Sequence, residues 1–163
     1  MNDILTKSLW QQFGASIDML KNAILACPDE HWDTKDDFWY LAYHTLFFLD
    51  YYLCLDANTF APPAPFTLSE FDESERPPRT YSKEELISYL EYCKTKCYSL
   101  ITEMTEETAF TNWTNQSQTM VYPLIELMMY NMRHVQHHTA QLNLLLRQNI
   151  NDAPDWVSRV GEV

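Results

Sequence analysis

The segment FWYLAYHTLFFLDYYLCL, residues 38–55, decides the fold of this chain. It is apolar on nearly every side of a helix, which is typical of a helix buried inside a bundle. His44, Asp50 and Asp56 interrupt the apolar run, so the segment does not qualify as a membrane span. We therefore predict that residues 37–56 form the most buried helix of an all-α protein.

Three amphipathic helices are predicted around this segment. Residues 4–26 carry apolar side chains at intervals of three and four, which form one stripe along a helix. Residues 82–104 begin with a capping box, in which Ser82 and Glu85 satisfy each other's backbone amides. Residues 123–148 form the last predicted helix, which starts at a proline suited to a first turn.

Irregular segments connect and follow these helices. Residues 57–80 contain prolines that rule out a continuous helix, and a loop of this length is usually functional or a mobile flap. Its acid-rich run, residues 70–75, is expected to be solvated, while its phenylalanines anchor the loop to the body. Residues 105–120 have room for a short hairpin. The tail, residues 149–163, is expected to be held in place by Trp156.

Four helices of about 20 residues, with one long crossover between the second and third, predict a four-helix bundle. No internal repeat or internal boundary is visible, so residues 1–163 are expected to form a single domain. The order in which the helices pack does not follow from the sequence.

Charge and cysteine content restrict the possible partners. Eleven Lys and Arg face 23 Asp and Glu, giving a net charge of −12, which disfavours binding to nucleic acid and to anionic membranes. The first ten residues, MNDILTKSLW, lack the basic start and apolar stretch of a secretory signal. The four cysteines are therefore expected to be reduced thiols in a cytoplasmic protein.

The segment RHVQHHTAQL, residues 133–142, holds three of the five histidines. His134 and His138 differ by about 40° around the helix axis, so both lie on the apolar face and can share one ion. His137 lies about 100° from His138 and becomes a ligand only if the helix is rotated. His44, taken alone, is most simply a neutral core histidine bonded to a carbonyl or a tyrosine hydroxyl.

Taken together, His44, His134 and His138 predict a metal site. Converging imidazoles are costly to bury when protonated, and need many hydrogen bonds when neutral, whereas a divalent metal accepts a lone pair from each. Three protein ligands leave a coordination position for water or substrate. Imidazoles suit zinc, nickel, iron or copper, among which the sequence does not choose. We expect His137 to lie outside the coordination shell.

At these residues the chain resembles the DinB / YfiT-like superfamily of metal-dependent enzymes. The shared features are a histidine in the second helix and an H-x3-H motif in the last, and the likeness extends from Leu9 to about Arg147. The resemblance implies an up-down-down-up four-helix bundle whose metal is held by three histidines, here His44, His134 and His138. It also implies a possible homodimer.

The resemblance further implies a thiol-dependent transferase. Characterised relatives include transferases and isomerases that use bacillithiol, mycothiol or glutathione. The expected partners are therefore a low-molecular-weight thiol cosubstrate, bound through the metal, and a small-molecule electrophile. Residues 57–80 would supply a lid. Tyr40, Tyr51 and Tyr130 are expected to be either hydrogen-bond donors at the site or core residues, and no catalytic residue is assigned.

Two alternatives stay open. A metal-dependent hydrolase would need a general base beside the open coordination position. Glu126 is a poor candidate for that base because it lies about 80° around the helix from His134. A non-catalytic, stress-related metal-binding bundle is the other alternative, and it would be favoured if the three histidines were sealed off from any pocket.

Overall fold

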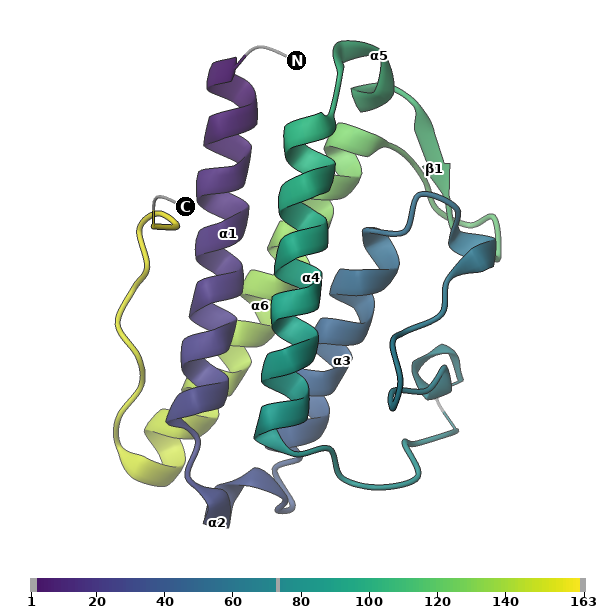
Figure 1. Ribbon diagram of the computed structural model, residues 1–163. Coiled ribbons are helices and arrows are strands. Elements are labelled where there is room, and N and C mark those ends of the chain that lie inside the picture. Colours follow the sequence, from purple (N-terminus) through teal and green to yellow (C-terminus); the bar gives the residue numbers. More distant parts are fainter. Residues whose placement is uncertain (1–2, 73, 162–163) are drawn as a thin grey trace.

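The computed structural model describes residues 3–72 and 74–161, and four long helices dominate this part of the chain (Figure 1). They are α1 (Asp3–Ala26), α3 (Phe38–Tyr52), α4 (Lys83–Glu103) and α6 (Leu124–Ile150). The connections contain the short helices α2 (Asp29–Trp32) and α5 (Glu106–Ala109), and the 3-10 helices η1 (Ala57–Thr59) and η2 (Ser69–Phe71). The prediction of an all-α bundle is confirmed.

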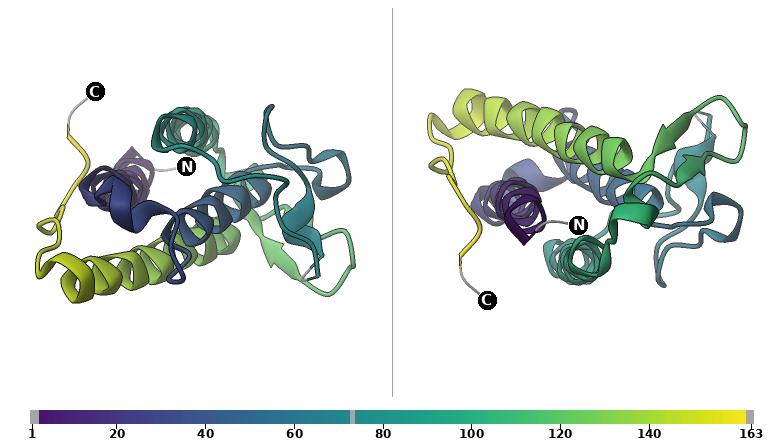
Figure 2. Two further views of the ribbon diagram at one scale, coloured as in Figure 1. Left: turned by 90° about the horizontal axis from the view of Figure 1, so that it is seen from below. Right: turned by 90° about the horizontal axis from the view of Figure 1, so that it is seen from above.

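The four long helices form two parallel pairs. α1 and α6 run in one direction, and α3 and α4 run in the other (Figure 1). Helix α6 packs against α1 and α3, and α4 packs against the same two helices from the other side. Figure 2 shows the segment between α3 and α4 and the β hairpin on one side of the bundle, and the C-terminal segment on the opposite side. This is the up-down-down-up order that the resemblance implied.

Helix α3 is buried along most of its length, as its composition predicted. Ala42, Tyr43 and Leu46 are fully buried in the core. His44 and Phe48, one turn apart, are only partly buried and lie on the side that meets α6. The helix ends at Tyr52, four residues before the predicted end, because the next amides turn back to bond the carbonyls of its last turn.

The connection before α6 contains a short hairpin. Strand β1 (Asn112–Thr114) pairs antiparallel with β2 (Val121–Pro123), and Trp113 lies opposite Tyr122. The indole of Trp113 is buried and donates to the carbonyl of Cys54 at 2.8 Å, which fixes the hairpin beside the end of α3. Of the two possibilities for residues 105–120, a short hairpin or a loop, the hairpin is present, with its second strand just beyond that range.

The acid-rich run in the loop differs from its prediction. Glu70 has only 2% of its side chain exposed, whereas solvated surface was expected for residues 70–75. The cause is the aromatic anchoring of the segment, which was predicted correctly. Phe66 stacks on Tyr89 with ring centroids 4.3 Å apart, and Phe71 lies 5.0 Å from Phe47. Glu73, within the same run, lies outside the described residues.

The C-terminal segment is held by a different residue from the one predicted. Trp156 is 68% exposed, so the expectation that it pins the tail was wrong. Val160 is buried instead, over the bare backbone of Gly14 in α1, and its amide donates to the carbonyl of Gln11 at 3.1 Å. The missing side chain at Gly14 is what lets the tail approach the helix so closely.

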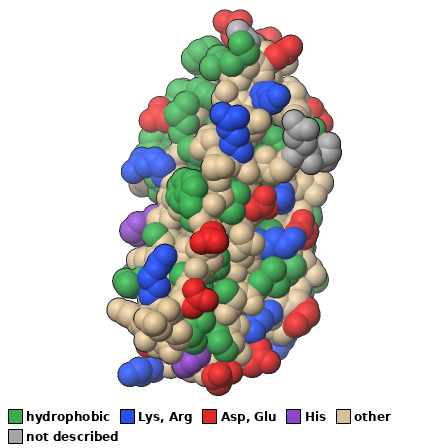
Figure 3. Space-filling view, turned by 90° about the vertical axis from the view of Figure 1, so that its left-hand side faces the viewer, with side chains coloured by type: hydrophobic (Ala, Val, Ile, Leu, Met, Phe, Trp, Pro, Cys, Tyr) green, Lys and Arg blue, Asp and Glu red, His purple; other side chains and the backbone are tan. Residues whose placement is uncertain are grey.

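The face in Figure 3 carries described side chains of both charges and no uniform charge patch. Basic and acidic side chains alternate on that face, with hydrophobic side chains between them. None of the helices in the described part of the chain combines the length and apolar character that crossing a membrane requires.

Candidate metal centre

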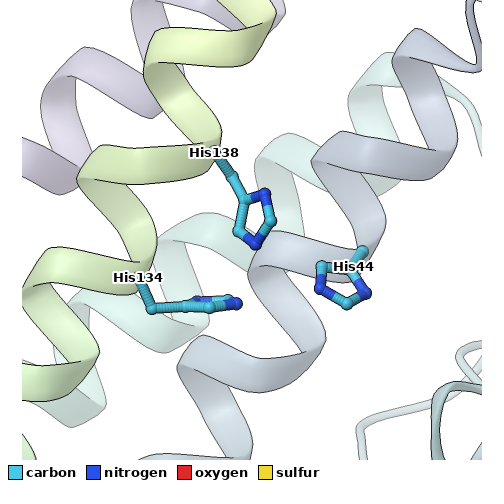
Figure 4. A group of neighbouring side chains, drawn as sticks. All are labelled: His44, His134 and His138. Carbon is cyan, nitrogen blue, oxygen red and sulfur yellow. The ribbon is translucent and has the colours of Figure 1, made fainter.

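The three predicted histidines meet between α3 and α6. His134 and His138 project from α6 toward α3, and His44 projects from α3 toward them (Figure 4). Their ring centroids are separated by 4.5 Å for His134 and His138, and by 4.9 and 5.7 Å from His44 to His138 and His134. One potential ligand atom from each residue lies within 4.8 Å of those of the others.

Hydrogen bonds to neighbouring side chains orient two of these rings. The Nδ1–H of His44 donates to Glu70 Oε2 at 2.7 Å, and the Nδ1–H of His138 donates to Gln141 Oε1 at 2.7 Å. A ring that donates through Nδ1 carries its lone pair on Nε2. One nitrogen of each ring points into the space shared by the three histidines (Figure 4). The site therefore presents lone pairs to a common centre.

The environment keeps His134 and His138 neutral. Burial, followed by the neighbouring imidazoles of His138, His44 and His137, lowers the pKa of His134 to about 3. Burial also lowers the pKa of His138, against the opposing effect of the hydrogen bond that this ring donates to Gln141. Metal ligation requires the neutral imidazole, which these two residues retain at neutral pH.

The arrangement fits a metal ion because it offers three neutral imidazole nitrogens close to one another. Three imidazole nitrogens at this spacing can approach a shared ion at the usual nitrogen–zinc distance of about 2.0–2.1 Å with small side-chain adjustments. His134 Nδ1 is buried and has no hydrogen-bond partner among the described residues, so no protein group fixes the tautomer of this ring as Glu70 and Gln141 do for the other two. The three-histidine site can hold a metal ion.

Comparison with known proteins agrees with this geometry. The sequence profile of the DinB family matches residues 1–149. The chain belongs to the DinB family. The matched range includes all four long helices up to the last turn of α6, and with them the three clustered histidines of this DinB protein. Searches of curated proteins and of solved structures find no match.

The other residues singled out in the sequence lie around this DinB site or away from it. His137 is exposed, with its ring 5.0 Å from that of His138, and is not among the three clustered residues. Tyr51 points toward the hairpin, where its hydroxyl accepts from the amide of Gln116 at 3.2 Å. Glu126 is exposed, as expected of a residue turned away from the site. That His137 stays outside the coordination shell remains a prediction.

Aromatic residues of the DinB protein form one wall of the site. The Phe48 ring lies 4.9 Å from His44 and 5.8 Å from His134, and Tyr52 lies 6.0 Å from His134. Burial, followed by the negative charge of Glu70, raises the pKa of Tyr40 to about 12, so its hydroxyl keeps its proton. The wall is apolar where it meets the imidazoles.

The site is open to solvent on its other side. The side chain of His44 is 31% exposed. A hollow of about 560 Å³ on the outer face of α6 is lined in part by His134, His137 and Tyr130. The three histidines are therefore not sealed inside the bundle, which removes the feature that would have favoured the non-catalytic metal-binding bundle.

Sequence reasoning missed two hydrogen-bond partners of the histidines. Gln141 follows His138 by three positions on one helix, a spacing that brings side chains together and could have identified it. Glu70 lies in an irregular, proline-rich segment, where no periodicity relates it to His44. Its pairing becomes visible only when the loop is folded against α3.

Proposed function

We propose that this DinB protein is a metal-dependent transferase that joins a low-molecular-weight thiol to a small electrophilic molecule. The observation that carries the proposal is the convergence of His44, His134 and His138 at a place where the His44 side chain is 31% exposed. Three protein ligands leave a coordination position free for a cosubstrate, unlike the four-ligand sites that serve structure. Imidazole donors make zinc, nickel and iron the candidate metals.

In such a reaction, different residues of the chain would bind the metal and exclude water from the site. The three histidines would hold a divalent cation, whose charge lowers the pKa of a thiol bound to it. Phe48 and Tyr52 exclude water from one side of the site, which strengthens electrostatic interactions there. In the transfer, the sulfur forms a bond to an electrophilic carbon, the leaving group departs with its electron pair, and the thiol proton passes to solvent.

The protein's own cysteines are poorly placed to supply the sulfur. Cys93 and Cys97 are fully buried on α4, and burial raises the pKa of both thiols. Burial also raises the pKa of Cys27 to about 11. Cys54 lies past the end of α3, where its thiol donates to the carbonyl of Asp56 at 3.2 Å. The proposal therefore takes the thiol from a separate molecule.

A hydrolase is the second candidate, because Glu70 places a buried carboxylate next to the site. A general base must lie within hydrogen-bond reach of the attacking water. Glu70 bonds Nδ1 of His44, on the opposite side of that ring from Nε2, and so lies away from the open coordination position. This placement makes the transferase the better supported of the two.

The first stage of the test is metal content. We expect untagged protein to bind one divalent ion, and His44→Ala, His134→Ala and His138→Ala to lose most of it in elemental analysis. His137→Ala is the matched control from the same helix and should retain the metal. Loss of metal in His137→Ala together with retention in His138→Ala would contradict the assigned ligand set.

The second stage asks whether a thiol reaches the metal. Cobalt-substituted protein is titrated with glutathione or bacillithiol while the visible and near-ultraviolet spectrum is recorded. An intense sulfur-to-cobalt charge-transfer band, absent from His44→Ala, is expected. If the cobalt protein forms but no thiol alters its spectrum, the transferase is refuted, and loss of an ester or amide substrate would then support the hydrolase.

A further inference from the structure

Glu70 is a carboxylate in an unusual place for a loop residue. Its side chain is 2% exposed, and its carboxylate interacts with the Tyr40 hydroxyl as well as with His44. Among the described residues, no lysine or arginine forms an ion pair with Glu70. Arg76 forms its ion pair with Asp37, at 3.0 Å. A buried carboxylate is costly unless a positive charge or hydrogen bonds compensate it.

Tyr40 and Arg76 compensate part of this charge, and the remaining contact of Glu70 is with His44. Its Oε2 atom accepts from His44 Nδ1 at 2.7 Å, which leaves Nε2 of that ring facing His134 and His138. A cation bound at Nε2 would balance the buried carboxylate across the imidazole. Carboxylates placed behind metal-binding histidines commonly fix the tautomer and orientation of the ring in this way.

The loop that carries Glu70 is attached to α3 mainly by aromatic contacts. Phe71, the next residue, packs 5.0 Å from both Phe47 and Tyr51. Glu70 adds a polar contact to the ligand itself, so the position of the loop and the orientation of His44 depend on each other. Metal binding and the Glu70–His44 contact are therefore linked. If the contact increases the affinity of the site for metal, bound metal must stabilise the contact by the same free energy.

We propose that Glu70 is the positioning residue that orients His44 for metal binding and thereby couples the docking of residues 66–72 on α3 to occupancy of the metal site. This inference rests on the metal site of the proposed function, but it requires neither a thiol nor a transfer reaction. Glu70 acts through His44 and has no role as a ligand.

The test compares zinc binding and loop protection in wild type and in Glu70→Ala. Zinc affinity, measured by competition with a chromophoric chelator, should fall by about 10–100-fold in the variant, the usual cost of losing such a partner. In hydrogen–deuterium exchange, zinc should slow exchange across residues 66–72 of the wild type, where the amides of Phe71 and Asp72 are hydrogen-bonded within the loop. This zinc-dependent protection should disappear in Glu70→Ala.

Two variants separate positioning from general damage to the loop. Glu75→Ala removes an exposed carboxylate from the same acidic run and should match wild type in both measurements. Glu70→Gln keeps the size of the side chain and an acceptor oxygen without the charge, so it should dock the loop and lose less zinc affinity than Glu70→Ala.

The outcomes distinguish this inference from the proposed function. Unchanged zinc affinity in both Glu70 variants would overturn the positioning role while leaving the metal site intact. Failure of a thiol to perturb the cobalt spectrum would overturn the transferase while leaving Glu70 in place. A metal-free readout is also available, because nitrogen-15 spectra of His44 should show the Nδ1–H tautomer in wild type and a mixture of tautomers in Glu70→Ala. Such a mixture already in wild type would refute the hydrogen bond.

Discussion

His134 links the stability of the metal-free protein to pH. Its pKa is about 3 in the folded state because of burial and the neighbouring imidazoles, against about 6.5 for an ordinary histidine. Between these values the unfolded chain binds more protons than the folded one. The free energy of unfolding therefore decreases as the pH falls from about 6.5 toward 3.

Replacing His134 removes this dependence. Metal-free His134→Gln should lose about 1–2 kcal/mol less than wild type when the pH is lowered from 7.5 to 5, because glutamine does not titrate. Urea denaturation in the presence of a chelator at both pH values measures the difference. His137→Gln, which alters an exposed ring, serves as the control. Equal losses in wild type and His134→Gln would show that His134 is not held neutral.

The candidate site was predictable from the sequence at the residues whose relation is fixed by helical geometry. His134 and His138 are four positions apart on one helix, so their convergence follows from the helix itself. His44 joined them by being a polar residue in the most apolar helix. Glu70 could not be found in the same way, because its position depends on how three phenylalanines fold a proline-rich loop onto α3.

At the scale of single elements, the first turn of α4 is fixed by a complete capping box. Ser82 Oγ accepts from the amide of Glu85 at 3.3 Å, and the amide of Ser82 donates to Glu85 Oε2 at 2.8 Å. Arg79 holds the same carboxylate through two hydrogen bonds. The capping box predicted from the sequence is confirmed in both of its hydrogen bonds.

Removing this cap should weaken the bundle measurably. Ser82→Ala leaves an amide in the first turn of α4 without its acceptor, and we expect a loss of about 1 kcal/mol in the free energy of unfolding. Ser88→Ala is the matched control, since Ser88 is exposed inside the same helix and bonds only a carbonyl of the preceding turn. Chemical denaturation of the two variants decides whether the cap contributes, and equal stabilities would show that it does not.

Element ends were less predictable than element types. The apolar run through Leu55 favoured a helix to residue 56, but α3 ends at Tyr52. After Tyr52 the chain leaves the helix and meets the hairpin, where the Trp113 indole donates to the carbonyl of Cys54. That carbonyl is satisfied by a residue 59 positions away, which a local pattern does not record.

At the scale of the whole molecule, the contact between Gly14 and Val160 joins the C-terminal segment to the bundle. An added Cβ at Gly14 would lie 2.9 Å from Val160 Cβ, too close for both to stay. Gly14→Ala should therefore release the tail. The gain in helix propensity of about 1 kcal/mol opposes the lost burial of Val160, worth at most about 1.5–3 kcal/mol, so the net effect on stability should be small.

Limited proteolysis measures this release. Trypsin should cut after Arg159 markedly faster in Gly14→Ala than in wild type, because Val160 no longer lies against α1. Gly161→Ala is the control, since no atom lies within 4 Å of a Cβ at that position. Unchanged cleavage in Gly14→Ala would mean that the tail adapts without leaving the helix.

The parallel course of α3 and α4 obliges the chain to travel back along the bundle between them. Helix α3 has 15 residues and is about 22 Å long, a distance that about seven extended residues can cover. About 30 residues connect the end of α3 to the start of α4, several times the number needed to span that distance. The additional residues allow the loop to place the Glu70 carboxylate beside His44, near the middle of α3. Shortening the loop would remove Glu70 together with Phe66 and Phe71, so the same extra residues supply both the polar contact behind His44 and the aromatic cover of the bundle.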